Sequence, residues 1–209
     1  MEQSDPAYFY PNRMGRIIFL AMEEILGQGG TNAVLNLANL SGFIQNYPAD
    51  NLERAFPFAV ISRLQAAMET YYGKHGGQGV AMRIGRTCFQ TGRRVYARQL
   101  SLGDLAFRLM PLQTRLQVGA NRLAEIFNQQ TDQQIHLEFK DEVILWKTKN
   151  CPLCWQRQTE SPSCHLTVGF LQEALDWVSS GKYFSVNEIS CMANGASACT
   201  IVINRNPMS

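Results

Sequence analysis

The spacing of apolar residues along the chain changes near residue 131. Before this point apolar residues recur at helical spacing, and after it they mostly alternate with polar ones. The pattern predicts a helical part over 13–130 and a sheet part over 131–205. Because 209 residues can form one sizeable core, we expect both parts to pack as a single α+β domain over 1–209.

The helical part contains clear start and stop signals. Thr31 and Asn51 are suitable N-cap residues, and Gly27 ends the first apolar-periodic segment. The glycine-rich stretch 73–79 separates the third helix from the fourth. We expect helices over 13–26, 31–40, 51–72, 80–98, 102–112 and 115–129.

The sheet part reads as two hairpins joined by a helix. The first hairpin alternates over 134–139, turns at 140–142 and continues over 143–147. Ser161-Pro162 starts the connecting helix and Gly181 ends it. The second hairpin pairs 183–191 with 198–204 and reverses at Asn194-Gly195, a dipeptide that suits tight turns. These elements predict one antiparallel sheet of about four strands with the helical half packed on it.

Composition excludes several classes of protein. Apolar residues make up 45% of the chain and charged residues 17%, as in ordinary globular domains. A net charge of +2 gives no dense basic stripe, so we expect no nucleic-acid partner. The longest apolar run, Ile17–Met22, is too short to cross a bilayer, and no secretory signal is apparent. We therefore expect a soluble cytoplasmic protein with reduced thiols.

Five of the six cysteines fall between Cys151 and Cys199, together with Glu188. Such clustering in a reducing compartment favours metal binding over disulfides, although a single buried cysteine is usually an inert core residue. Cys164 falls in the first turn of the expected connecting helix, where the helix dipole stabilises a thiolate. Glu188 and Cys191 are an odd number of residues apart, so they converge only if the strand is irregular near Ser190. Cys191 and Cys199 likewise require a local bulge.

Residues 163–202 resemble the signature of the 4-vinyl reductase domain family. That signature is a cysteine before a glycine-containing helix, followed by Glu-x-x-Cys-x-Ala-x-Gly-x-x-x-Cys. The matching positions here are Cys164, Gly169, Glu188, Cys191, Ala193, Gly195 and Cys199. The resemblance implies a fold like that of small transport-particle (TRAPP) subunits. It also implies a structural zinc ion held by Cys164, Glu188, Cys191 and Cys199.

Cys151 and Cys154 are left outside this ligand set. The spacing is compatible with an alternative set that combines them with Cys191 and Cys199, with a second metal ion, or with an iron–sulfur cluster.

The resemblance further implies binding of a hydrophobic small molecule, which is an aromatic, a hydrocarbon or a tetrapyrrole precursor, between the helices and the sheet. Aromatic residues that are candidates to line this pocket, or simply to fill the core, are Phe43, Tyr47, Phe56, Phe58, Tyr71, Phe107, Trp146, Phe170 and Trp177. A basic series suits tetrapyrrole carboxylates or a solvated helix face: Arg83, Arg86, Arg93, Arg94 and Arg98.

Two other functions compete with simple binding. The family name suggests reduction of a vinyl group on a chlorophyll precursor, but the chain has neither a nucleotide-binding Gly-x-Gly-x-x-Gly after a strand nor a phosphate loop. A zinc ion fully coordinated by protein also has no open position for catalysis. We therefore favour a non-enzymatic binder, accessory to pigment or photosystem biogenesis. The third function is assembly through protein contacts, with helices 13–26 and 51–72 packed across a two-fold axis in a homodimer.

Overall fold

The computed structural model describes residues 7–100 and 105–208 as a helical N-terminal part followed by an antiparallel sheet with its own helix. The elements of the N-terminal part are β1 (Phe9–Pro11), α1 (Asn12–Leu37), η1 (Ser41–Phe43), β2 (Arg54–Pro57), α2 (Phe58–Val95), α3 (Ala97–Leu100), α4 (Leu105–Leu109) and α5 (Leu112–Gln130). Those of the C-terminal part are β3 (Gln134–Phe139), β4 (Val143–Lys149), α6 (His165–Ser179), β5 (Val186–Ser190), η2 (Met192–Asn194) and β6 (Cys199–Asn204).

The two long helices contain the glycine breaks that the sequence predicts, but as kinks. Gly27 in α1 has a φ of 70°, and Gly73 in α2 has a φ of 73°. Glycine adopts this left-handed conformation without steric cost, so the chain bends there and the helix resumes at once. The separate helices expected on either side of each glycine are therefore consecutive segments of α1 and α2.

The expected start of a helix at Asn51 is wrong. Residues 54–57 form β2, which pairs with β1 in a two-stranded sheet, and α2 begins only at Phe58. Pro57 at the N-cap has the fixed φ of proline and cannot occupy a helix interior, which explains the late start. Part of the helix expected over 102–112 lies outside the described residues, and α4 covers 105–109 of it.

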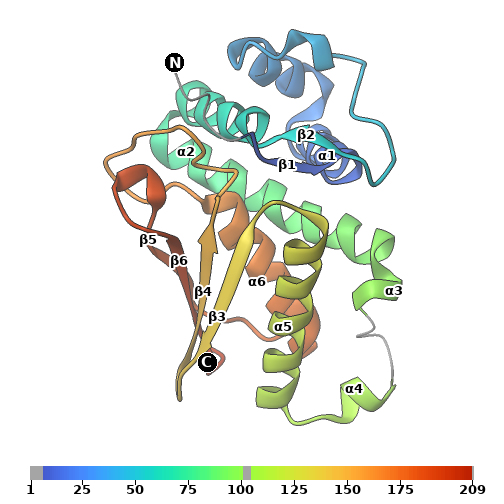
Figure 1. Ribbon diagram of the computed structural model, residues 1–209, viewed down its shortest axis with the longest axis vertical. Helices are drawn as coiled ribbons and strands as arrows, with labels where there is room; N and C mark the ends of the chain where they lie inside the picture. The colour runs from blue at the N-terminus through green and yellow to red at the C-terminus, as the bar shows by residue number, and fades with distance from the viewer. Residues whose placement is uncertain (1–6, 101–104, 209) are drawn as a thin grey trace.

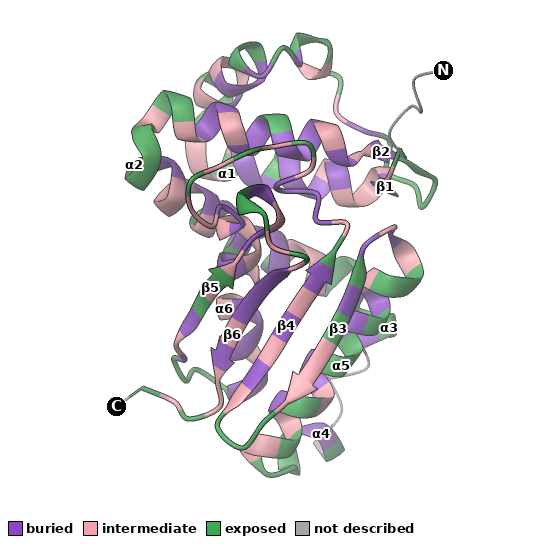
Figure 2. Cartoon of the chain, turned by 60° about the vertical axis from the view of Figure 1, so that its left-hand side comes forward, coloured by how far each residue is buried: buried purple, intermediate pink, exposed green. Residues whose placement is uncertain are grey.

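The main sheet has four antiparallel strands in the order β3-β4-β6-β5, as predicted in number and direction. The two hairpins meet where β4 pairs with β6, and Trp146 of β4 lies between Leu137 and Ile201 in the register. Helices α5 and α6 lie against one side of this sheet, and the layer of α1 and α2 crosses its end (Figure 1). In Figure 2 buried residues alternate along β4 and β6 with less buried ones.

Helices α2 and α6 approach each other until their backbones touch. A Cβ atom added at Gly85 would lie 2.0 Å from the carbonyl oxygen of Leu166, and one added at Gly169 would lie 2.0 Å from the carbonyl oxygen of Met82. Only glycine fits at both positions. This contact fixes the start of α6 against the N-terminal helices. Among the described residues, none of the helices is both long and apolar enough to cross a membrane.

Candidate metal centre and ligand cavity

Five thiols and one carboxylate converge at one end of the sheet. Cys151 and Cys154 lie in the segment after β4, Cys164 is the N-cap of α6, and Cys191 and Cys199 flank the turn between β5 and β6. All five thiols are at most 4% exposed. The fold thus brings all the cysteines that the sequence singles out into one buried cluster.

Three of these sulfurs and Glu188 form a compact group. The Sγ–Sγ distances are 3.7 Å for Cys164–Cys191, 3.6 Å for Cys164–Cys199 and 3.8 Å for Cys191–Cys199. Zinc–sulfur bonds of about 2.3 Å in a tetrahedron place sulfurs roughly 3.8 Å apart, so the spacing suits a single ion. Glu188 Oε2 accepts a hydrogen bond of 2.7 Å from the backbone N–H of Cys164. Its Oε1 is buried without a hydrogen-bond partner among the described residues.

Cys151 and Cys154 lie beside the same group. Cys151 Sγ is 3.4 Å from Cys164 Sγ, and Cys154 Sγ is 3.4 Å from Cys199 Sγ. Two sets of four donors therefore have all their ligand atoms within 4.8 Å of one another, and both include Cys164 and Cys199. The sets are Cys151, Cys154, Cys164, Cys199 and Cys164, Glu188, Cys191, Cys199.

The irregular backbone expected near Ser190 is confirmed. The β5–β6 register shifts between Glu188 and Ser190, which turns Glu188 and Cys191 toward the same point. The two-residue turn expected at Asn194-Gly195 is wrong, because β5 ends at Ser190 and β6 begins only at Cys199. The intervening segment forms η2, with Gly195 at a φ of 93° as its C-cap.

Burial dominates the acidity of these groups. It raises the pKa of the Glu188 carboxyl to about 8, and the nearby Cys191 thiolate adds to the effect. Hydrogen bonds with neighbouring thiols, that with Cys151 first, raise the pKa of Cys164 and lower that of Cys154. Negative charge in such a buried cluster is costly without a compensating cation.

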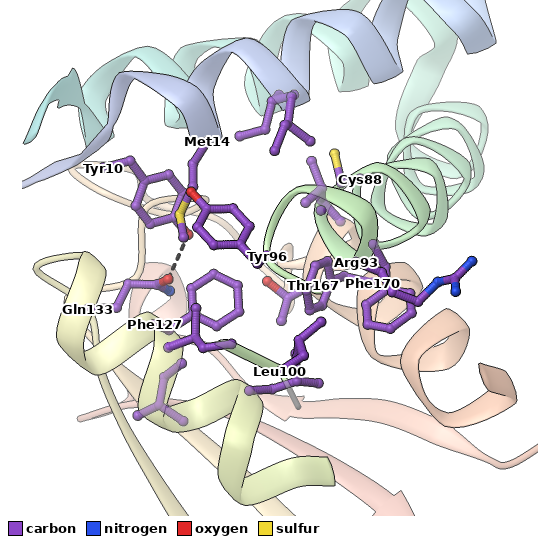
Figure 3. A pocket seen from close by; sticks show the side chains of 18 of the residues that line it. Tyr10, Met14, Cys88, Arg93, Tyr96, Leu100, Phe127, Gln133, Thr167 and Phe170 are labelled. Atoms are coloured by element: carbon purple, nitrogen blue, oxygen red, sulfur yellow. Dashed lines mark hydrogen bonds between the residues drawn. The ribbon is translucent and has the colours of Figure 1, made fainter. Parts of the chain in front are cut away.

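A second feature is an apolar cavity of about 100 Å³ between the helical part and the sheet. Its wall combines residues from nearly every layer: Tyr10 of β1, Met14 of α1, Tyr96 beside the end of α2, Phe127 of α5 and Thr167 of α6 (Figure 3). Because its lining is almost entirely apolar, the cavity suits a hydrophobic molecule.

Two tyrosine hydroxyls belong to this wall. Tyr10 donates a hydrogen bond of 2.6 Å to Gln133 Oε1, drawn as a dashed line in Figure 3. The hydroxyl of Tyr96 is buried and has no hydrogen-bond partner among the described residues. Burial raises the pKa of Tyr96, so this hydroxyl keeps its proton at neutral pH.

Of the aromatic residues singled out from the sequence, Trp146 and Phe170 line the cavity. Phe43, Tyr47 and Phe56 pack instead around the ring of Phe19. The others lie elsewhere: Phe58 packs against Tyr8 and Tyr10, Tyr71 is 55% exposed, and Phe107 and Trp177 border a separate surface hollow.

The basic series is spread along α2 and its end. Arg83, Arg86, Arg94 and Arg98 are exposed. Arg93 borders the cavity and lies 5.3 Å from the ring centre of Trp177, a cation–π distance. Sequence reasoning did not single out Tyr10, Tyr96 or Gln133, because no motif marks residues at element ends that meet only in the folded chain.

The chain resembles several H-NOX structures across nearly its whole length. The S. oneidensis protein in the Fe(II)NO state is 12% identical with a TM-score of 0.57, covering 93% of this chain and 99% of that one. The unliganded Fe(II) protein from K. algicida is 12% identical with a TM-score of 0.57, covering 92% and 96%. A third structure, from a study of haem distortion in the H-NOX family, is 14% identical with a TM-score of 0.54, covering 94% and 95%.

At these identities the likeness concerns the fold alone, a helical N-terminal half with an antiparallel sheet. It does not test the transport-particle likeness, which stays a prediction. None of the curated proteins matches the chain. The family model of the 4-vinyl reductase domain matches residues 145–205. This segment holds all five clustered cysteines and Glu188, and it belongs to the family that their spacing indicates.

Proposed function

We propose that this protein binds a small hydrophobic molecule in the cavity, without catalysis, and that a structural zinc ion on Cys164, Glu188, Cys191 and Cys199 holds the 4-vinyl reductase domain in shape. The observation that carries the proposal is the apolar cavity enclosed by both halves of the chain. Enclosed apolar cavities remain dry and accept apolar guests.

The size of the cavity indicates its guest. An engineered cavity of about 150 Å³ accepts benzene, so a cavity of about 100 Å³ suits one aromatic ring or a short hydrocarbon. A tetrapyrrole precursor has four such rings and exceeds this volume. We therefore narrow the ligand class to single-ring aromatics and small hydrocarbons.

The H-NOX relatives are described with haem and Fe(II), but the residues here do not fit a haem. No histidine is among the described residues that line the cavity. Its one thiol, Cys88, is not suited as an axial ligand, because burial raises the pKa of that thiol to about 12. Together with the small volume, this donor set argues against a haem.

The Tyr96 hydroxyl adds a chemical preference. A buried hydroxyl without a partner is costly, and a guest carrying one oxygen could pair with it. Phenol has the size of one ring and one such oxygen. We therefore choose phenol as the probe and toluene as its counterpart without oxygen.

Zinc is supported by the donors themselves. Three thiolates and a carboxylate are a ligand set that zinc accepts, and the sulfur spacings of 3.6–3.8 Å suit the edges of a single-ion tetrahedron. An iron–sulfur cluster places bridging sulfides between its cysteines and spreads them further apart. Iron and acid-labile sulfide in the purified protein would replace the zinc assignment.

The binding proposal is tested by calorimetric titration with phenol and toluene. Thr167→Leu adds bulk inside the cavity, and we expect at least a tenfold loss of affinity for both probes. Thr70→Leu makes the same change on the exposed side of α2 and should leave both affinities unchanged. If neither probe binds the wild-type protein, or if Thr167→Leu binds both normally, the cavity is not the binding site.

The two alternative functions have their own readouts. Vinyl reduction requires NAD(P)H-dependent spectral change with a divinyl chlorophyll precursor, and its appearance would replace the binding proposal. An assembly role predicts a stable protein partner. We further propose a cytoplasmic homodimer that uses α1 and α2, on which Leu20, Leu37 and Tyr71 are 41%, 45% and 55% exposed. Sedimentation equilibrium tests the dimer.

A further inference from the structure

We infer that the thiol cluster is a dinuclear metal centre, in which two divalent zinc-class ions are bridged by the thiolates of Cys164 and Cys199. One ion has Cys151 and Cys154 as its other ligands, and the second has Glu188 and Cys191. The inference deepens the zinc site proposed above and rests on that assignment.

The first argument is how the six donors are arranged. Both four-donor sets contain Cys164 and Cys199, whose sulfurs are 3.6 Å apart, the spacing of one tetrahedral edge. Cys191 lies 3.7 Å and 3.8 Å from these two sulfurs. Cys151 and Cys154 approach the same pair, each at 3.4 Å from one member. The arrangement is that of two tetrahedra sharing an edge.

The second argument is charge. A single zinc ion on three thiolates and one carboxylate leaves a net charge of minus two. Ionising Cys151 and Cys154 as well would add two buried negative charges, which is strongly unfavourable. A second divalent ion cancels both charges, so the dinuclear centre with all five thiolates also carries minus two. Thiolate sulfur retains lone pairs that allow it to bridge two ions.

The third argument is how the segment after β4 is held. Cys151 and Cys154 are 3% and 4% exposed, so this segment directs both thiols inward. It is fastened on both sides of the cluster. Ser62 Oγ of α2 donates a hydrogen bond of 2.6 Å to the carbonyl of Trp155, and the N–H of Thr159 donates one of 2.8 Å to the carbonyl of Ala193. The segment therefore closes over the centre with two thiols placed for an ion.

Metal content tests the inference directly. For protein purified with zinc under reducing conditions, mass spectrometry of the metal should give two equivalents per chain. The double variant Cys151→Ser/Cys154→Ser should retain one equivalent, and Cys191→Ser should also retain one. The matched control is Cys88→Ser, which removes the sixth thiol, outside the cluster, and should retain two.

A second measurement needs no variant. Cadmium-113 NMR of the wild-type protein reconstituted with Cd²⁺ should show two resonances, one for a four-thiolate site and one for a site with three thiolates and a carboxylate. One equivalent of metal with one resonance, unchanged in the double variant, overturns the second ion but leaves the first zinc site intact. Metal-free protein, or iron with sulfide, overturns both assignments.

Discussion

At the scale of single residues, Tyr10 and Tyr96 differ in what their hydroxyls contact. Tyr10 donates to Gln133, whose side chain is itself buried, whereas the hydroxyl of Tyr96 has no partner among the described residues. The same chemical change at the two positions should therefore have opposite effects. Removing one member of a buried pair leaves the other unsatisfied, while removing a lone buried hydroxyl removes a desolvation cost.

We predict that Tyr96→Phe leaves the free energy of unfolding unchanged or raises it by up to about 1 kcal/mol. Tyr10→Phe, the matched control, should lower it by about 1–3 kcal/mol because Gln133 loses its donor. Urea unfolding measures both. In titrations, Tyr96→Phe should weaken phenol binding about fivefold and leave toluene binding unchanged. Equal loss for the two probes would mean that the hydroxyl does not contact the guest.

At the scale of elements, the crossing of α2 and α6 depends on two glycines. No side chain fits at Gly85 or Gly169, because a Cβ atom at either position would overlap a backbone carbonyl of the other helix. A backbone contact cannot relax by changing a rotamer. The family signature contains the second of these glycines, and the structure gives it a steric reason.

We predict that Gly85→Ala lowers the free energy of unfolding by about 1–3 kcal/mol or more, because the helices must move apart. Gly79→Ala is the matched control on the same helix, since its new Cβ meets nothing within 4 Å. That change should raise stability by roughly 0.5–1 kcal/mol through the unfolded chain. Thermal unfolding compares them, and equal effects at both positions would contradict the steric account.

Elements also show what the sequence could predict. Alternation and turn residues predicted β3 and β4, and the odd spacing of Glu188 and Cys191 predicted the irregular end of β5, because these signals are local. The short strands β1 and β2 were missed, since pairing between segments far apart in the chain leaves no periodic pattern. The wall of the cavity was mostly missed for the same reason: its residues come from many elements and meet only through tertiary packing.

At the scale of the whole molecule, the metal centre and the cavity share structural elements. Cys164 is the N-cap of α6, and the cavity wall begins two residues later with Leu166 and continues with Thr167 and Phe170. On the sheet side, Trp146 of the wall pairs with Ile201, two residues beyond Cys199. Loss of the ion should loosen the start of α6 and the end of β6 together, and so disturb the wall.

We predict that removing the metal with a thiol-compatible chelator weakens toluene binding about tenfold, a coupling of about 1.4 kcal/mol. Linkage requires the reverse effect, so saturating toluene should slow or weaken metal loss to the chelator by a similar factor. Calorimetry on metal-depleted and zinc-restored protein measures the first effect, and a colorimetric zinc indicator measures the second. Restored zinc must recover the affinity, because failure to do so would indicate irreversible unfolding. Equal affinities with and without metal would show that the two sites act independently, which would limit the ion to stabilising the terminal hairpin.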